Sequence, residues 1–349
     1  MKNKNNEKDD SFIHKICFLK NIVHLMNGIV PKKLLKIIFL FTFSFFYTTS
    51  FFAQDTIKFF QPSSEFNNKR FVSSIGVQAV GYGSSLALLS SVWYKKYEQT
   101  SFHFFDDSDE WLQMDKAGHF ITSWYLGRIG TDLMKWSGVK QPKVIWIGFI
   151  GGFVYLTGIE LMDGFSDGWG FSWSDFSANT LGTGLIMGQN FLEYKGKNFA
   201  LANGVKGLSI KFYFHQTNFP NYRPGLLGKN LSEQIVKDYN GQTYWLSFNL
   251  SSFMKEETRF PKWLNIAAGY GGEYMITGSP HDFYVDPSGN SIWMERYRQY
   301  YLSLDVDVTR IKTKSHFLKT VFKTFSFIKI PAPAFEINRK GMRFHSLYY

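Results

Sequence analysis

The spacing of hydrophobic and polar residues changes once along the chain, near residue 195. Before that point, long apolar stretches are interrupted only by isolated polar residues, and this pattern predicts helices. We expect four of them, over residues 71–94, 115–136, 144–162 and 174–192. The first has no charged residue and the third has only Glu160, so both are typical of helices that cross a membrane or pack tightly in a core.

After residue 195, apolar and polar residues alternate, and this pattern predicts strands. The clearest strands are expected at residues 208–215, 244–251, 266–276 and 300–309, with shorter ones at 325–330 and the C-terminus and a short helix at 231–239. These five or six strands are fewer than the roughly eight that a closed membrane barrel needs. Two arrangements stay open: an incomplete sheet whose apolar face covers the helices, or strands that meet lipid.

The fold class that we predict is α+β. A four-helix, membrane-style bundle is expected in residues 54–195, followed by an antiparallel β-sheet or partial barrel in residues 196–349. Lysines precede an apolar run at residues 37–46, so residues 1–53 are predicted to be a secretory signal peptide with a long N-terminal extension. Met1 and Met26 are both candidate starts of translation.

The composition favours an exported, membrane-associated protein over a nucleic-acid-binding one. Aromatic residues make up 19% of the chain, which is typical of surfaces that contact membranes. The formal charge is +11, but without residues 1–53 the chain keeps 31 Lys and Arg against 25 Asp and Glu. This modest excess favours anionic lipid headgroups, and no basic run suited to nucleic acid remains. The only cysteine, Cys17, would leave with the signal peptide, so we expect no disulfide, thiol nucleophile or lipid-modified cysteine.

Polar pairs on three of the predicted helices are the candidate functional residues. Their members lie three or four positions apart, so each pair projects from one helix face. The pairs are Asp115 with His119, Glu160 with Asp163, and Asp175 with Asn179. If the three faces converge, one pocket holds four carboxylates, an imidazole and an amide. Such a group can bind a divalent cation or provide a general acid and base.

Two of the pairs also have a structural interpretation. Asp115 can stabilise the start of its helix while His119 faces a groove, and Ser172 with Asp175 resembles a capping box. The acidic run at residues 106–110 lacks the spacing and glycine of a calcium loop and is predicted to be a solvated linker.

The third pair is harder to explain by helix structure, because Glu160 and Asp163 oppose the dipole at a helix C-terminus. A positive group should compensate them, and the candidates are Lys116, Arg128 and a bound divalent metal. The candidate metal ligands are His119, Glu160, Asp163 and Asp175.

The same residues carry a resemblance to a known family. The motifs are MDKAGHF at residues 114–120, GIELMDG at 158–164 and FSWSDFSANTLG at 171–182. They resemble the uncharacterised predicted periplasmic lipoproteins of the YfiM type, a domain of unknown function, over roughly residues 111–188. Their order is also similar to the VanZ-like membrane family. The resemblance implies a cell-envelope location and supplies no established reaction. Without a mature cysteine, membrane attachment would depend on the helices or strands.

Two function hypotheses follow. The first is a membrane-associated structural or binding module, for a lipid headgroup or a cation, in the outer membrane or facing the periplasm. The second is a lipid- or cell-wall-modifying hydrolase in which His119 is the general base, Asp115 orients it, and Glu160, Asp163 and Asp175 act as acid or metal ligands. Whether the chain is an enzyme stays open, as does residence in the inner membrane. Open space at the point of convergence would favour the hydrolase.

Overall fold

The computed structural model describes residues 59–92, 94, 97–195, 207–255 and 258–348. The described helices and strands belong to one compact unit of the chain, which begins at residue 60, and a second unit comprises residues 1–59. The predicted signal peptide lies outside the described residues. Helices and sheet both belong to the unit that begins at residue 60, so the change of pattern near residue 195 is a change of secondary structure within one unit.

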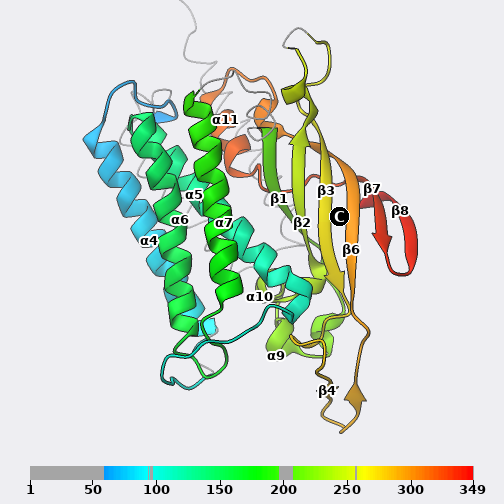
Figure 1. Cartoon of the computed structure of the whole chain (residues 1–349). Coiled ribbons are helices and arrows are strands. Elements are labelled where there is room, and N and C mark those ends of the chain that lie inside the picture. The colour runs from blue at the N-terminus through cyan, green and yellow to red at the C-terminus, as the bar shows by residue number, and fades with distance from the viewer. Residues whose placement is uncertain (1–58, 93, 95–96, 196–206, 256–257, 349) are drawn as a thin grey trace, which may run out of the picture. The chain divides into compact units, whose positions relative to one another are not determined.

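Four long helices lie next to one another (Figure 1). They are α4 (Asn68–Val92), α5 (Met114–Trp136), α6 (Gln141–Asp163) and α7 (Trp173–Lys195), close to the four predicted ranges. Glycine residues allow three of these helices, α5, α6 and α7, to approach one another closely. A Cβ atom on Gly152 of α6 would lie 2.6 Å from the carbonyl oxygen of Ser123 on α5 and 3.0 Å from a methyl group of Thr183 on α7. This packing brings side chains of α5, α6 and α7 within reach of one another.

An antiparallel sheet of six strands lies beside the helices (Figure 1). In spatial order the strands are β1 (Leu208–Phe214), β2 (Gln242–Asn249), β3 (Leu264–Glu273), β6 (Tyr297–Val306), β7 (Ala332–Asn338) and β8 (Gly341–Tyr348). A separate hairpin of β4 (Tyr284–Val285) and β5 (Ser291–Ile292) joins β3 to β6. Among the described residues β1 and β8 do not pair, so the sheet is not closed.

Short helices connect the strands. They are α9 (Pro224–Leu227), α10 (Leu231–Lys237) and α11 (His316–Thr324), and α10 matches the predicted short helix. The strand predicted at residues 325–330 is wrong, because this segment follows α11 as a turn and makes one isolated bridge, from Ile328 to Phe212 of β1. The strand in this part of the chain is β7. Its sequence argues against a strand, because Pro333 has no backbone N–H to donate to a neighbouring strand.

The helices cover only one end of the apolar face of the sheet. Ile210 of β1 packs between Trp124 of α5 and Ile186 of α7, and Tyr244 of β2 packs against Met114 of α5. Farther along the sheet the same face is exposed. The sheet is therefore incomplete, as in the first of the two predicted arrangements, but its apolar face covers the helices only at the β1 end.

The opposite face of the sheet buries a polar network. Lys211 Nζ lies 2.6 Å from Asp305 Oδ2, to which the Ser247 hydroxyl also donates at 2.6 Å. Asn265 Nδ2 donates to Ser247 Oγ at 2.8 Å, and Lys329 Nζ donates to the carbonyl of Leu304 at 2.8 Å. Charged and polar groups thus fill the side of the sheet that is shielded from solvent.

Two described helices have the length and composition to cross a membrane, namely residues Asn68–Ser90 of α4 and the whole of α6. Buried core helices of soluble proteins have the same properties. The membrane-style character of the bundle therefore stays a prediction.

Candidate functional site

The candidate residues lie where α5 and α7 begin and α6 ends. The start of α7 is fixed by Ser172, whose hydroxyl accepts a hydrogen bond from the backbone N–H of Asp175 at 3.1 Å, as the capping-box pattern predicts. The polar members of the three helix ends consequently face one another. All six candidate residues lie in or beside the cluster that results.

His119 is the centre of this cluster. Its Nδ1 lies 3.2 Å from Asn179 Oδ1 and 3.4 Å from Glu160 Oε1, and its Nε2 lies 3.9 Å from Asp175 Oδ2. Single ligand atoms of His119, Glu160 and Asp175 all lie within 4.8 Å of one another. The His119 side chain is 24% exposed, against 1% for Glu160 and 8% for Asp175. A partly accessible imidazole therefore lies beside two buried carboxylates.

Lys116 organises the neighbouring acids. Its Nζ lies 2.7 Å from Asp107 Oδ2, 2.8 Å from Asp115 Oδ2 and 3.2 Å from Asp175 Oδ1. The group Asp107, Asp115 and Asp175 also has the spacing of a metal site, but the ammonium group already lies against all three carboxylates. Asp115 thus holds Lys116 and does not orient His119 by a direct hydrogen bond among the described contacts.

The acidic run at residues 106–110 is not simply a solvated linker, and that prediction is wrong for Asp107. The Asp107 side chain is 14% exposed and accepts hydrogen bonds from Ser172 at 2.6 Å and Ser174 at 2.8 Å. These hydroxyls belong to the start of α7, where a carboxylate is favoured by the helix dipole. The acidic run was the available signal for Asp107, but its sequence spacing does not reveal this contact.

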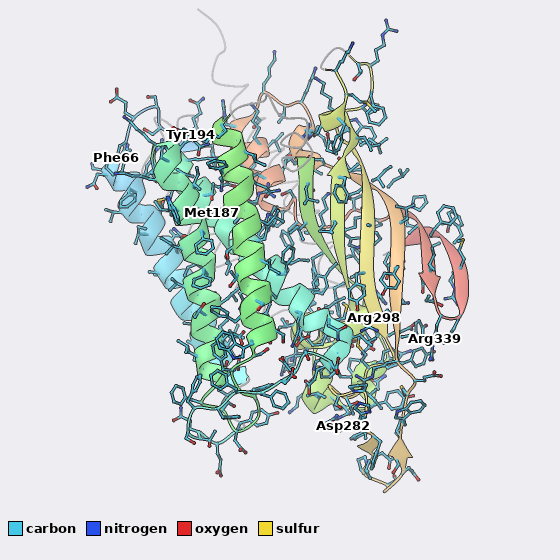
Figure 2. The ribbon with its side chains drawn as sticks, in the orientation of Figure 1. Phe66, Met187, Tyr194, Asp282, Arg298 and Arg339 are labelled. Carbon is cyan, nitrogen blue, oxygen red and sulfur yellow. The ribbon has the colours of Figure 1, made fainter. Side chains whose placement is uncertain are left out.

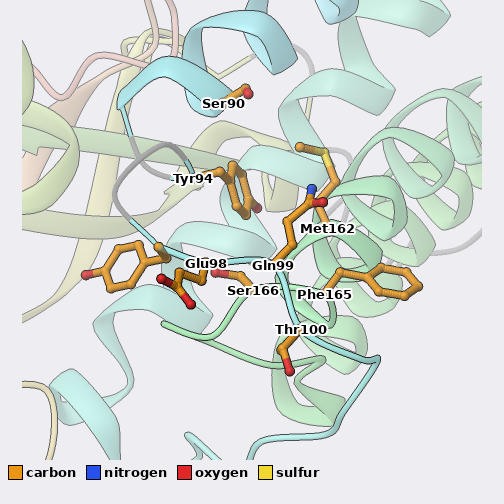
Figure 3. A pocket seen from close by; sticks show the side chains of 9 residues that line it. Ser90, Tyr94, Glu98, Gln99, Thr100, Met162, Phe165 and Ser166 are labelled. Carbon is orange, nitrogen blue, oxygen red and sulfur yellow. The ribbon is translucent and has the colours of Figure 1, made fainter.

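Asp163 lies on another side of the cluster. Its Oδ1 accepts a hydrogen bond of 2.6 Å from the hydroxyl of Tyr94, a contact that sequence spacing gave no signal for. Tyr94 also lines a pocket of about 370 Å³ between the loop after α4 and the end of α6, together with Gln99 and Met162 (Figure 3). The described lining of this pocket does not include His119.

Negative charge exceeds positive charge in the cluster. Among the residues that the structure describes, the cluster has one ammonium group and one imidazole against five carboxylates, those of Asp107, Asp115, Glu160, Asp163 and Asp175. Arg128, a predicted partner, lies over the ring of Trp124 at 5.4 Å instead. Glu160 Oε1 and Asn179 Nδ2 are buried without a hydrogen-bond partner in the described part of the chain. Buried acids in excess must either hold protons or bind a cation.

The local charges shift the titration of this cluster. Burial raises the pKa of Asp175 to about 7, although His119 and Lys116 oppose the shift. Burial by itself lowers the pKa of His119, but the carboxylates of Asp175 and Glu160 raise it above its ordinary value. The cluster therefore retains protons near neutral pH, and a divalent metal would displace them.

The donor set suits a transition metal. One imidazole nitrogen and two carboxylate oxygens are the ligands that Zn²⁺, Mn²⁺ and Fe²⁺ bind, whereas Ca²⁺ prefers a larger set of oxygens. His119, Glu160 and Asp175 would be the three protein ligands, and the accessible side of His119 would leave a position for water. Of the four predicted ligands, Asp163 is outside this three-residue group, because Tyr94 bonds its Oδ1.

One comparison with known proteins gave a match. The model of a family described as predicted periplasmic lipoprotein (DUF2279) matches residues 103–190, about a quarter of the chain. No curated protein and no solved structure matches the chain. The matched segment contains all six candidate residues and confirms the resemblance that their motifs indicate. The family description supports an exported protein of the cell envelope, and the sheet lies beyond the match.

Proposed function

We propose that the chain is a membrane-associated envelope protein whose helical region binds a divalent transition metal through His119, Glu160 and Asp175. The carrying observation is the convergence of three ligand atoms within 4.8 Å in a cluster with excess negative charge. A purely structural polar cluster would pair its acids, as Lys116 does for Asp115. Glu160 instead has only the imidazole as a nearby positive group among the described contacts.

Metal analysis tests this proposal. The full chain is extracted in detergent, stripped with a chelator, and titrated with Zn²⁺ and Mn²⁺ by calorimetry, with elemental analysis of the purified protein alongside. We expect one ion per chain. Glu160→Gln keeps the side-chain shape but removes the charge, and it should weaken binding by at least about 100-fold, equivalent to about 2.7 kcal/mol.

Glu193→Gln is the matched control. Glu193 lies near the end of α7, is half exposed and pairs with Lys135 away from His119. Its substitution should leave metal affinity unchanged. Equal affinity of the Glu160→Gln variant and the wild type would exclude the proposed site, as would the absence of binding by the wild type.

The hydrolase is the second candidate function. The observation that favours it is the partial exposure of His119 beside buried acids, because a bound metal would supply an activated water at such a position. The pocket of about 370 Å³ lies on the Tyr94 side of the cluster, and His119 is not among its described lining residues. Release of product from envelope phospholipids or peptidoglycan by the metal-loaded wild type, but not by Glu160→Gln, would establish the hydrolase.

The membrane location that we propose is the outer membrane. The six-stranded antiparallel sheet, with its polar buried side, supports this over the inner membrane, although α4 and α6 have the length for either. Separation of the two membranes on a density gradient and detection of the full chain in each fraction tests the assignment. Recovery with inner-membrane markers would contradict it.

A further inference from the structure

The exposed face of the six-stranded sheet is its apolar face. Outward residues of β6 and β7 include Leu302, Leu304, Phe335 and Ile337, which are 55%, 48%, 50% and 52% exposed. Ile210 belongs to the same face in β1, where helices cover it, and is 1% exposed. Through the strand register, Ile210 pairs with Leu246, and further partners continue this row to Phe344 of β8. One apolar surface thus runs across all six strands and is covered only at its β1 end.

The inward face has the opposite chemistry. Thr243, Ser247, Ser303, Asp305 and Glu336 point to the buried side and are at most 5% exposed. A sheet of a water-soluble protein turns its apolar side to the core and its polar side to solvent. Here the pattern is reversed, as in strands whose outer side contacts hydrocarbon and whose inner side is polar.

The sheet also curls, with the polar face on its inner side. The ring of Tyr348 at the end of β8 lies 4.4 Å from the ring of Tyr301, and its hydroxyl lies 3.0 Å from the hydroxyl of Thr243 on β2. Three strands separate β8 from β2 in the sheet, so these side chains meet only if the inner face is concave. The apolar face is consequently convex. Fluid acyl chains can cover a convex surface continuously, whereas a rigid second copy would contact only part of it.

The dimensions and borders of the surface also fit a bilayer. Strands β3 and β6 have ten residues each, about 34 Å at 3.4 Å per residue. A tilted strand of this length crosses an apolar band of about 25 Å.

Aromatic and charged residues mark the two ends of this band. At one end the exposed Trp263 lies among the exposed Arg259 and Lys262. At the other, Tyr270 and Tyr300 form one row, and Arg298 lies one row farther (Figure 2). Aromatic residues at both interfaces with cations outside them are typical of membrane-embedded surfaces.

We propose that the convex apolar face of β2, β3, β6, β7 and β8 contacts the acyl chains of a lipid bilayer. This inference deepens the proposed membrane location and is independent of the cation site. Gly118, next to His119, lies beside the ring of Tyr244, and Tyr244 pairs with Tyr270 in the aromatic row. The polar cluster therefore lies at the level of the lipid headgroups, outside the hydrocarbon.

Site-directed labelling tests the surface directly. Cys17 is the only cysteine of the sequence, so a Cys17→Ala background accepts single cysteines without interference. An environment-sensitive fluorophore is attached at Leu302→Cys and Phe335→Cys on the outward face, and at Ser288→Cys in the exposed turn of the β4–β5 hairpin as control. The full chains are reconstituted in vesicles of phosphatidylethanolamine and phosphatidylglycerol that carry doxyl groups on their acyl chains.

Each outcome has a distinct meaning. We expect the doxyl groups to quench at least about half of the fluorescence at Leu302 and Phe335 and little at Ser288, since quenching requires contact with acyl chains. Failure of the wild type to enter vesicles overturns both this inference and the proposed membrane location. Vesicle binding with equal quenching at all three positions overturns the lipid-facing sheet alone. If the chain forms a dimer without lipid and the label at position 302 is shielded from solvent in it, the apolar surface belongs to an interface with a second copy. This result would also overturn the lipid-facing sheet.

A second variant guards against labels that disturb folding. Leu302→Asn combined with Phe335→Asn should reduce partition into vesicles by at least about tenfold while the far-ultraviolet circular dichroism stays unchanged, because both substitutions lie on the exposed face. Thr309→Asn, at an exposed position after β6, is the control and should not change partition. Unchanged partition of the double variant would contradict the proposal.

Discussion

The helical region and the sheet both bury charged groups, but they balance them differently. In the sheet, Asp305 lies between two ammonium groups, with Lys211 at 2.6 Å and Lys329 at 3.9 Å. In the helical region, five carboxylates meet two basic groups among the described residues, those of Lys116 and His119. A buried carboxylate that lies against ammonium groups is neutralised by them, whereas carboxylates in excess leave a position for a cation. The difference supports the proposed cation site in the helical cluster and a structural role for the sheet network.

The largest expected effect tests whether the buried polar network of the sheet stabilises the fold. Asp305→Asn leaves two buried ammonium groups without a carboxylate, so the free energy of unfolding should fall by about 3–5 kcal/mol. Chemical denaturation followed by circular dichroism measures it. Glu295→Gln removes the exposed ion pair with Arg339 and should cost no more than about 1 kcal/mol. A similar small cost for Asp305→Asn would mean that the sheet network is not structural.

The next effect tests whether close helix packing positions the site. A Cβ atom on Gly182 of α7 would clash with the backbone of Phe120 on α5, so Gly182→Ala should destabilise the protein by about 1–3 kcal/mol and weaken metal binding. Gly184, half a turn away, has open space around it, and Gly184→Ala should stabilise by about 0.5–1 kcal/mol. Thermal unfolding and metal titration of the two variants distinguish them. Equal behaviour would show that α5 and α7 can separate freely.

The pH dependence of the stability of the metal-free protein tests the excess of carboxylates in the helical cluster. The pKa of Asp175 is raised to about 7 in the folded state, from about 3.9 when unfolded. Between these values the folded state holds more protons, so its stability falls as pH rises from 5 to 8. His119, whose pKa is also raised, acts in the same direction.

Because Asp175 titrates together with His119 and Glu160 rather than alone, we expect a loss of about 1–2 kcal/mol rather than the roughly 4 kcal/mol of an isolated group. Asp175→Asn should reduce this slope in denaturation curves, and Glu160, whose pKa burial raises to about 8, should maintain the rest. Added Zn²⁺ should reverse it in the wild type, because the ligands must lose protons to bind. Wild-type stability that rises between pH 5 and 8 without metal would refute the assignment.

The smallest effect concerns the border of the site. Asp163→Asn weakens the hydrogen bond from Tyr94 and should cost about 0.5–1.5 kcal/mol of stability. Metal affinity should change by less than about threefold, since Asp163 lies outside the three ligands. Calorimetric titration decides this, and a loss as large as that of Glu160→Gln would make Asp163 a fourth ligand.

Periodicity predicts the regular elements well where no special residue interferes. Long apolar stretches indicate α4 to α7, and strict alternation indicates β1, β2, β3 and β6. The prediction fails at β7, because Pro333 argues against a strand and because the neighbouring segment at 325–330 is more β-like by composition. Local propensity cannot show which of two adjacent segments will find a partner strand.

The candidate site was only partly predictable. Spacing within a helix selected His119, Glu160 and Asp175, because residues four apart must share a face. It also selected Asp163, which lies outside the three-residue group, and it offered Lys116 as one candidate partner of Glu160 and Asp163, whereas Lys116 lies against Asp107, Asp115 and Asp175. Those assignments depend on distances between helices, and these follow from glycine contacts such as Gly182 with Phe120.

The sequence by itself determined the helices, most of the strands, and which polar residues share a face within each helix, because each follows from a local period of the chain. Only the tertiary structure decided which face of the sheet is buried. Alternation shows that the strands have an apolar and a polar side, but both sides obey the same period. The curl that brings Tyr348 to Thr243, and the contact of the helices with β1 and β2 at one end of the sheet, turn the polar side inward. Likewise, the distances between the helices decided which charged groups pair. Lys116 lies against Asp115, and Glu160 lies against the imidazole of His119.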